Sequence, residues 1–325
     1  MKNYVVKKYQ STNYSLWNEF VAAAKNATFL FHRDFMEYHS DRFQDYSLLI
    51  FDEKENLKAI LPANKVGDTI YSHQGLTYGG LILNQKSKLQ DVLEITYYIL
   101  RFLNENKIST LNLKQLPSIY AQFPSEEMEY LSFILNAKLV RRDSLSVLDL
   151  KTDYSFSKDR KQAINRGIKN NLVIKEETDF KAFWNEILIP NLEQKHNAKP
   201  VHTLEEITFL KSKFPKNIRQ FNVYKDELII AGTTIFVYDK VAKPQYISGN
   251  SDKNELGSLD FLYDFLVNEF KHKSYFDFGT SNEENGRKIK EGILFWKESF
   301  GSRTIVQNFY EIETKNYSLI ENVLI

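Results

Sequence analysis

A short segment in the second half of the chain carries hydroxyl and carboxylate side chains at close spacing. Tyr246 and Ser248 can donate a proton and Asp252 can accept one, and general acid–base chemistry needs both abilities. Asp277 is a second candidate acceptor, although a carboxylate at a strand end equally often binds backbone N–H groups. Lys297 follows two large aromatic residues in an expected helix and is a candidate cation, whereas most helical lysines are solvated.

Two adjacent cations near the amino terminus stand just before an expected short helix. Asp34 and Glu37 have the spacing of a helix cap with a carboxylate three residues later, which predicts a helix that begins at Phe35. His32 and Arg33 would then lie just outside the helix, where a phosphate or carboxylate binds readily. The alternative is that Arg33 pairs with a nearby acid and that His32 is a satisfied, partly buried side chain.

The segment Ser72–Gly80 holds three glycines in nine positions. Glycine lets a backbone approach a ligand closely, so His73, Tyr78 and Gly79 are candidate binding residues. The alternative is a turn that needs glycine only for its positive φ angles.

A basic stretch in the middle of the chain, Ser157–Asn170, has the pattern of an amphipathic helix. Arg160, Arg166 and Lys169 lie on overlapping faces of that helix. A solvated basic face is the ordinary explanation, and phosphate binding by the two arginines is the functional one.

The elements that must position these residues occur twice along the chain. The segment Val5–Lys8, followed by Trp17, reappears as Val173–Glu176, followed by Trp184. Later matches, in the same order, are strands 57–66 and 228–237, strands 69–78 and 244–249, helices 86–105 and 257–271, strands 110–113 and 275–278, and helices near 126–136 and 286–300 that precede closing strands. We therefore predict an internal duplication with a first domain over 1–152, a basic connecting helix over 153–171 and a second domain over 172–325.

Each half reads strand, two helices, three strands, helix, strand, helix and closing strands, an order that resembles the GNAT acyltransferase fold. A tandem pair joined by a basic helix is similar to the Fem family of peptidoglycan bridge-forming aminoacyl transferases. The segments that carry this resemblance are Phe29–Phe35, Ser72–Gly80, Arg160–Lys169, Asp277–Gly279 and Phe295–Gly301. The resemblance implies an α/β protein with mixed sheets and two tandem GNAT-like domains, the fold of acyl-CoA N-acyltransferases.

One departure from the GNAT pattern concerns the donor. Acetyl-coenzyme A enzymes of this fold have an Arg/Gln-x-x-Gly-x-Gly/Ala turn whose backbone N–H groups hold the pyrophosphate. Lys253–Ser258 in the second half and Leu83–Lys88 in the first do not match it. Fem relatives also depart from that turn and take an aminoacyl group from tRNA. The donor is therefore either an acyl-CoA co-substrate or a charged tRNA.

The resemblance implies an N-acyltransferase that moves an acyl or aminoacyl group to the amine of a small acceptor by direct attack. The acceptor would be a nucleotide-linked sugar or another precursor of the cell envelope or of a polysaccharide. The expected catalytic residues are Tyr246, Ser248, Asp277 and Lys297, and the expected substrate-binding residues are His32, Arg33, His73, Tyr78, Gly79, Arg160 and Arg166. The alternatives are a tRNA-dependent Fem-type transferase and a non-catalytic duplicated module that binds a nucleotide sugar.

Composition and the absence of known motifs exclude several other classes of protein and of functional site. The chain has 325 residues, a net charge of +1 and 42% hydrophobic residues, which indicates a folded protein without a general basic field for DNA. It has no cysteine, so disulfides, thiolate zinc sites and cysteine nucleophiles are excluded, and we expect no metal. The amino terminus lacks a secretory signal and no segment is long and apolar enough to insert into a membrane, so we expect a cytoplasmic protein. Serine-hydrolase, P-loop and dinucleotide-binding signatures do not occur.

Overall fold

The computed structural model describes residues 2–325, which form two compact units. The first unit contains the chain through Asp143 together with Glu284–Arg287 and Val306–Ile325, and the second contains Ser144–Glu283 and Lys288–Ile305. The chain passes from one unit to the other within two long strands, β9 (Lys138–Asp149) and β17 (Arg303–Glu313). Each unit thus includes a closing strand segment from the other half of the sequence. The division near residue 152 stays a prediction about folding domains.

The first unit has two sheets. One has the order β1-β3-β4-β7, and in the other β17, β8, β6, β5 and β2 are neighbours in that order. The strands are β1 (Tyr4–Lys8), β2 (Gln44–Asp45), β3 (Leu48–Asp52), β4 (Leu57–Leu61), β5 (Asn64–Val66), β6 (Thr69–Tyr71), β7 (Ile82–Leu83) and β8 (Thr110–Lys114). The helices are α1 (Tyr14–Ala23), α2 (Arg33–Met36), α3 (Leu89–Glu105) and α4 (Glu127–Ile134).

Three details of the first unit differ from the prediction. The expected strand 57–66 is divided into β4 and β5 at Pro62, which has no N–H group for a ladder hydrogen bond. The expected strand 69–78 ends at Tyr71, and the following residues form a loop. Helix α2 begins at Arg33 and not at Phe35, because His32 already has the extended backbone of an N-cap residue.

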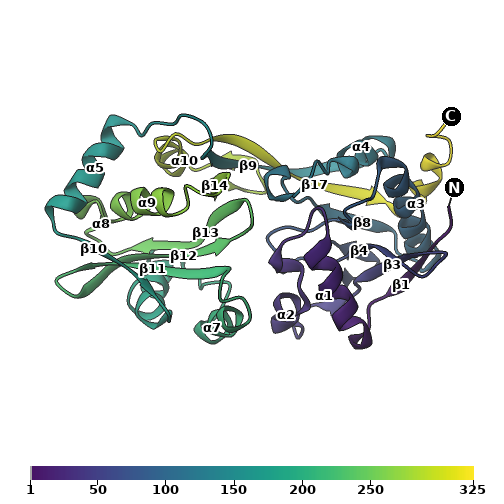
Figure 1. The fold of residues 1–325 in the computed structure, drawn as a ribbon, viewed down its shortest axis with the longest axis horizontal. Coiled ribbons are helices and arrows are strands. Elements are labelled where there is room, and N and C mark those ends of the chain that lie inside the picture. The colour runs from purple at the N-terminus through teal and green to yellow at the C-terminus, as the bar shows by residue number, and fades with distance from the viewer. Residues whose placement is uncertain (1) are drawn as a thin grey trace. The chain divides into compact units, whose positions relative to one another are not determined.

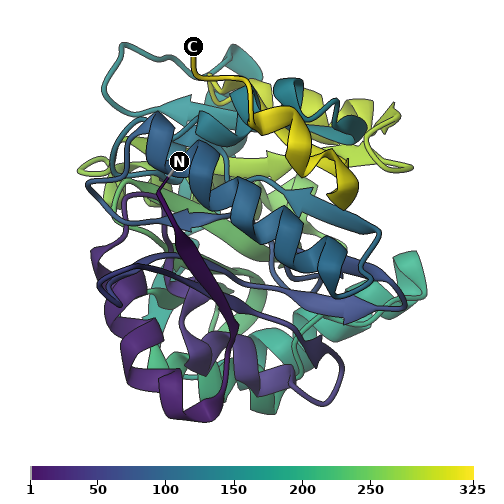
Figure 2. The ribbon, with the colours of Figure 1, turned by 90° about the vertical axis from the view of Figure 1, so that its right-hand side faces the viewer.

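Helix α3 and the carboxyl-terminal segment complete the core of the first unit. The apolar face of α3, which includes Val92 and Leu103, packs in one cluster with Ile312 and Ile320 from the end of the chain. Figure 2 shows α3 beside the yellow turn of helix over Thr314–Ile320.

The second unit has one sheet with the order β10-β11-β12-β13-β14-β9. Its strands are β10 (Val173–Glu177), β11 (Ile218–Lys225), β12 (Leu228–Val237), β13 (Val241–Gly249) and β14 (Tyr275–Thr280), and a small separate ribbon pairs β15 (Asn282–Glu283) with β16 (Lys288–Ile289). Its helices are α5 (Lys158–Lys169), α6 (Ile189–His196), α7 (Leu204–Lys213), α8 (Lys253–Leu256), α9 (Ser258–Glu269) and α10 (Glu291–Glu298), and a π-helical turn over Phe183–Leu188 leads into α6.

Helices cover both faces of this sheet. Helices α9 and α5 lie on one face of β11–β13, and α7 lies on the other (Figure 1). Two glycines bring α5 close to its neighbours: a Cβ atom on Gly167 would lie 2.5 Å from Phe261 Cβ, and one on Gly257 would lie 2.1 Å from the Ala163 carbonyl oxygen. The predicted connecting helix is therefore held firmly within the second unit.

The two units repeat one order of elements. The first reads β1, α1 and α2, β3, β4, β5 and β6, α3, β8, α4 and β9, and the second reads β10, α6 and α7, β11, β12, β13, α9, β14, α10 and β17. The predicted α/β class with mixed sheets is confirmed.

Candidate functional site

A cleft forms in the second unit where two parallel strands separate. Strands β13 and β14 pair only at Val241 with Tyr275 and at Ala242 with Phe276. Beyond these pairs β13 continues alongside β12, whereas β14 follows β9. The two strands therefore leave unpaired backbone on either side of an opening, and such an opening is a natural place for a ligand.

The cleft has a volume of about 810 Å³ and a mixed lining. One wall comes from β13 and the other from the end of β14 and from α10. The basic residues of the lining are Arg160, Arg166, Lys243, Lys253 and Lys297, and its apolar residues include Ile247, Leu259, Phe278, Ile293, Phe295 and Trp296. This combination suits a ligand that carries both negative charge and an apolar part.

Lys297 is the most distinctive side chain of the cleft. It is 6% exposed, and its Nζ donates hydrogen bonds to the carbonyl oxygens of Gly279 at 3.0 Å and of Thr280 at 2.7 Å. Burial lowers the pKa of Lys297 to about 8, and the nearby charge of Lys243 lowers it further. An ammonium group has three donors, so one N–H remains for a ligand.

Lys243 and Asp277 form a buried ion pair behind Lys297. Lys243 Nζ lies 3.2 Å from Asp277 Oδ2, and the other carboxylate oxygen accepts a 2.7 Å hydrogen bond from the Gly279 N–H. Asp277 is fully buried and does not line the cleft. Its position therefore matches the structural alternative raised by the sequence, because it fixes the turn that presents the Gly279 carbonyl group to Lys297.

The two predicted catalytic hydroxyls of β13 have different surroundings. Ser248 lines the cleft, and its Oγ accepts a 2.8 Å hydrogen bond from Asn191 Nδ2 of α6. Tyr246 does not line the cleft; its ring packs against Trp184, and its hydroxyl oxygen accepts a 3.0 Å hydrogen bond from the His202 N–H. The two residues are two apart in regular register on β13 and so lie on the same face of the strand, but only Ser248 borders the cleft.

Both predicted arginines of α5 line the cleft. Arg160 forms an ion pair with Asp260, which also accepts a 2.8 Å hydrogen bond from Trp296 Nε1, and its buried Nε has no hydrogen-bond partner within residues 2–325. Arg166 is exposed, and its Nη2 donates to the Asn254 carbonyl oxygen at 3.2 Å. Arg166 therefore offers the more accessible charge for an anionic ligand.

No protein-family model matches the sequence, and no curated protein does either. Solved structures match it. FemX has 9% identity and a TM-score of 0.66, with 97% of this chain and 100% of that chain covered. L-PGS from Bacillus licheniformis has 13% identity and a TM-score of 0.56, with 86% of each chain covered. A tandem GNAT protein from the clavulanic acid biosynthesis pathway has 12% identity and a TM-score of 0.50, with 96% of this chain and 99% of that chain covered.

The chain has a tandem GNAT-like fold. The predicted resemblance to Fem and tandem GNAT proteins is thus confirmed at the level of the fold. In the second GNAT-like unit, the cleft between β13 and β14 is the opening between its fourth and fifth main strands. The identities are too low to transfer any residue role.

The segment expected to depart from the GNAT pyrophosphate turn is helical. Residues Lys253–Leu256 form α8, where the Leu256 N–H donates to the Asp252 carbonyl oxygen at 2.9 Å. Gly257 ends that helix in the left-handed conformation, and its N–H donates to the Lys253 carbonyl oxygen. These two backbone donors are therefore used within the protein and not presented to a phosphate.

The predicted cations near the amino terminus lie in the first unit. Arg33 is 3% exposed; it pairs with Asp45, and its Nε lies 2.8 Å from Glu37 Oε1. Its guanidinium also stacks on the Tyr9 ring at 3.7 Å. His32 is half-buried, and burial lowers its pKa. Arg33 is thus fully engaged by internal partners, as the structural alternative expected.

The glycine-rich loop of the first unit folds back on itself. A Cβ atom on Gly79 would lie 1.9 Å from the Ser72 carbonyl oxygen, so only glycine fits there. The Tyr78 hydroxyl is hydrogen-bonded to that of Tyr120, and both rings are buried. His73 is 4% exposed and has a positive φ of 68°. Of these predicted binding residues, His73 lines a second cavity, which lies in the first unit.

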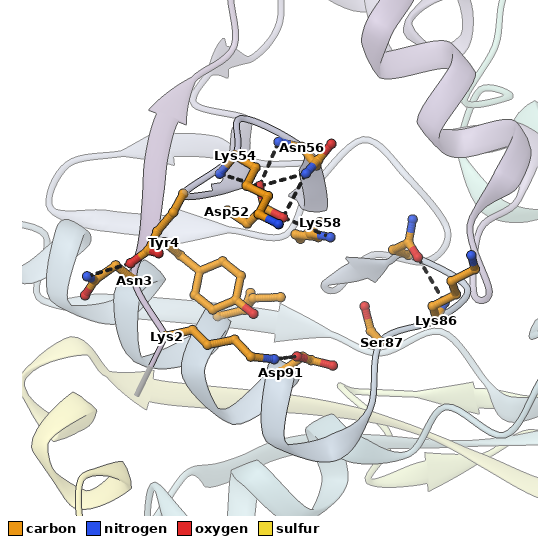
Figure 3. A pocket seen from close by; sticks show the side chains of 13 residues that line it. Lys2, Asn3, Tyr4, Asp52, Lys54, Asn56, Lys58, Lys86, Ser87 and Asp91 are labelled. Carbon is orange, nitrogen blue, oxygen red and sulfur yellow. Dashed lines mark hydrogen bonds and ion pairs between the residues drawn. The ribbon is translucent and has the colours of Figure 1, made fainter.

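A further surface pocket of the first unit contains two internal ion pairs (Figure 3). Lys2 Nζ lies 2.7 Å from Asp91, and Lys58 Nζ lies 3.0 Å from Asp52. Asn56 donates to Asp52 as well, and these contacts hold the pKa of Asp52 far below its usual range despite the opposing effect of burial. We therefore consider the cleft of the second unit the better candidate site.

Sequence reasoning missed two residues of the cleft. Lys243 was missed because the strand was expected to begin at Pro244, whereas β13 begins at Val241. Its signal was a lysine within an otherwise apolar strand. Asn191 lies on α6, far from Ser248 in the sequence, and carried no local signal.

Within residues 2–325, no helix has both the length and the apolar character that a membrane span requires.

Proposed function

We propose that the protein is an N-acyltransferase that works in the cleft of the second unit. The observation that carries this proposal is the buried Lys297 ammonium, which lies where β13 and β14 separate and retains one unused donor. Acyl transfer develops negative charge on the carbonyl oxygen, and a fixed cation in a water-poor cleft stabilises that charge strongly. The fold supports the same reaction class, although fold alone does not determine function.

The residues of the cleft suit direct attack. The acceptor amine attacks the activated carbonyl carbon, a C–N bond forms, and the bond to the sulfur or oxygen of the leaving group breaks. Lys297 donates its free N–H to the oxyanion while it is protonated, which at neutral pH is its main form because its pKa is about 8. Ser248 Oγ accepts from Asn191, so its own O–H is available to protonate the leaving group, and Oγ in turn receives the proton that the attacking amine loses.

We expect side chains, rather than backbone N–H groups, to bind the anionic part of the donor. Arg166 and Lys253 both line the cleft beside α8. Arginine binds phosphate through two parallel hydrogen bonds, so Arg166 is the expected contact for a diphosphate or for the 3′ end of a charged tRNA. The acceptor is the amine of a nucleotide-linked sugar or cell-envelope precursor, as the resemblance implies.

An aminoacyl-tRNA donor is the second candidate. The use of the Leu256 and Gly257 N–H groups within α8 favours it, because these donors are then not free to cradle the pyrophosphate of coenzyme A. Binding of tRNA would weaken steeply with salt, since phosphate contacts release counterions.

The test is a transfer assay with the purified protein, an amino-sugar nucleotide and each donor in turn: acetyl-CoA, a longer acyl-CoA and aminoacylated tRNA. Mass spectrometry detects the acylated acceptor. We expect product with one donor class, and Arg166→Gln should raise the KM for that donor about tenfold while kcat changes little. The exposed Lys271→Met serves as the control. Absence of product with every donor would contradict the proposal.

A further inference from the structure

A second cavity, of about 430 Å³, lies within the first unit. Its lining includes the end of β8, the start of the glycine-rich loop, and parts of β9 and β17. Two of its lining residues, Lys114 and Arg141, are basic, and no aspartate or glutamate is among the residues that line it. A half-buried cation such as Lys114, which no carboxylate among the described residues contacts, is costly, so such a lining calls for an explanation.

Lys114 is the less compensated of the two cations. Burial lowers its pKa to about 8, and the Arg141 guanidinium adds to this effect, whereas the charge of the Asp143 carboxylate opposes it. Its Nζ donates to the Leu76 carbonyl oxygen at 2.5 Å, and no carboxylate of residues 2–325 forms an ion pair with it. Two donors of the ammonium group therefore remain for another partner.

Arg141 keeps part of its hydrogen-bonding capacity. It forms a bidentate pair with the buried Asp143, with Nε–Oδ1 and Nη2–Oδ2 distances of 2.9 and 2.6 Å. The guanidinium lies over the Phe309 ring at 4.6 Å. The Asp143 contact fixes the orientation of the planar group, and the remaining N–H groups are not used by that contact.

A third polar residue of the cavity has an unsatisfied atom. The Nδ1 atom of His73 is buried and has no hydrogen-bond partner within the described part of the chain. Burial, together with the nearby His39, lowers the pKa of His73 to about 3, so the ring is neutral. His73 also adopts a positive φ, which costs free energy for a non-glycine residue.

We propose that this cavity, the Lys114 pocket, binds the carboxylate or phosphate group of a small molecule. Lys114 supplies the charge, Arg141 adds oriented donors, and the aromatic rings of Tyr71, Phe309 and Tyr310 surround the body of the ligand. The volume lies in the range of small-molecule sites and exceeds the need of a bare ion. The Lys114 pocket lies entirely in the first unit, so the proposal does not depend on the chemistry proposed for the second.

The test is isothermal titration calorimetry of the full chain at constant ionic strength. The probes are phenyl phosphate and benzoate, which share an aromatic body, together with inorganic phosphate and acetate, which lack it. We expect saturable binding of at least one aromatic probe, weaker binding of its bare ion, and a loss of at least tenfold in affinity in Lys114→Gln, because a charged hydrogen bond is removed. The exposed Lys138→Met should bind as the wild type does.

The probes also separate the two sources of the anion. Preference for phenyl phosphate assigns a phosphate ligand, and preference for benzoate assigns a carboxylate ligand. Circular dichroism checks that each variant is folded, and Arg141→Gln, with an expected loss of severalfold, replaces Lys114→Gln if the latter does not fold. Absence of binding by all four probes, or equal binding by folded Lys114→Gln and wild type, would overturn the proposal.

Discussion

Each unit has a pair of parallel strands at the same point of the repeated order of elements. The two units differ in what lies beyond the paired residues. In the first unit β6 pairs with β8 as far as Tyr71 and Asn112, and the loop that follows returns against the end of β8. The Lys114 N–H donates to Ser72 Oγ at 2.7 Å, and Gly79 packs on the Ser72 backbone. In the second unit β13 continues to Gly249 after it leaves β14, and a cleft of about 810 Å³ remains.

This difference teaches that a repeated order of elements does not preserve a site. Both units withdraw a lysine from solvent near the end of the fifth main strand, the half-buried Lys114 on β8 and the buried Lys297 beside β14, and this desolvation lowers the pKa of each to about 8. Lys297 faces the cleft between separated strands, whereas Lys114 contacts a loop that fills the corresponding place.

The largest expected effect concerns the cleft. Lys297→Met should lower kcat about 100- to 1000-fold, the usual consequence of removing one oxyanion donor, which is about 3–4 kcal/mol of transition-state stabilisation. Steady-state kinetics with the productive donor measures it, and Lys271→Met is the matched control. An unchanged kcat in a folded Lys297→Met protein would contradict the proposal that the reaction takes place in the cleft of the second unit.

The next effect concerns Arg33 of the first unit. Arg33→Met should lower the free energy of unfolding by about 3 kcal/mol, because it leaves Asp45 and Glu37 without their cation. Denaturant unfolding measures this change. The KM of the acceptor should stay as in the wild type, and an increase with little change in stability would instead restore Arg33 as a binding residue.

A smaller effect tests the packing of the glycine-rich loop. Gly79→Ala should cost about 2 kcal/mol of stability, since its methyl group would meet the Ser72 backbone. Gly292→Ala is the control, because nothing lies within 4 Å of a Cβ atom there. Thermal unfolding of the two variants compares them; equal melting temperatures would indicate that the loop is not packed as described.

The smallest effect is a dependence of stability on pH. The folded-state pKa of Lys114 and of Lys297 is about 8, below the ordinary value of 10.5, so the unfolded chain holds more protons between these values. Their contribution to the free energy of unfolding should therefore rise between about pH 8 and 10.5, by on the order of 1 kcal/mol each. Denaturant unfolding across this range measures the slope, which should decrease in Lys114→Gln and in Lys297→Met but persist in Lys138→Met.

Much of the secondary structure could be predicted from periodicity. Strand 228–237 and the helix within 157–170 were located closely, because each has a clear apolar pattern and clear ends. The strand expected over 69–78 failed after Tyr71, since a run of polar residues and glycines gives no signal of where a chain turns back. The role of Tyr246 could not be judged because its ring and hydroxyl group contact Trp184 and His202, which are distant in the sequence.

The sequence by itself determined the repeated order of elements, the mixed α/β class and the absence of cysteine chemistry, because these follow from local patterns and composition. Tertiary structure alone decided which strands separate, that Lys243 and Asp277 pair, and that Asn191 meets Ser248. It also buried Arg33 among its partners and, within residues 2–325, left Lys114 without an ion pair. The physical reason is that burial, charge pairing and pKa depend on atoms brought together from distant parts of the chain, and no local pattern records them.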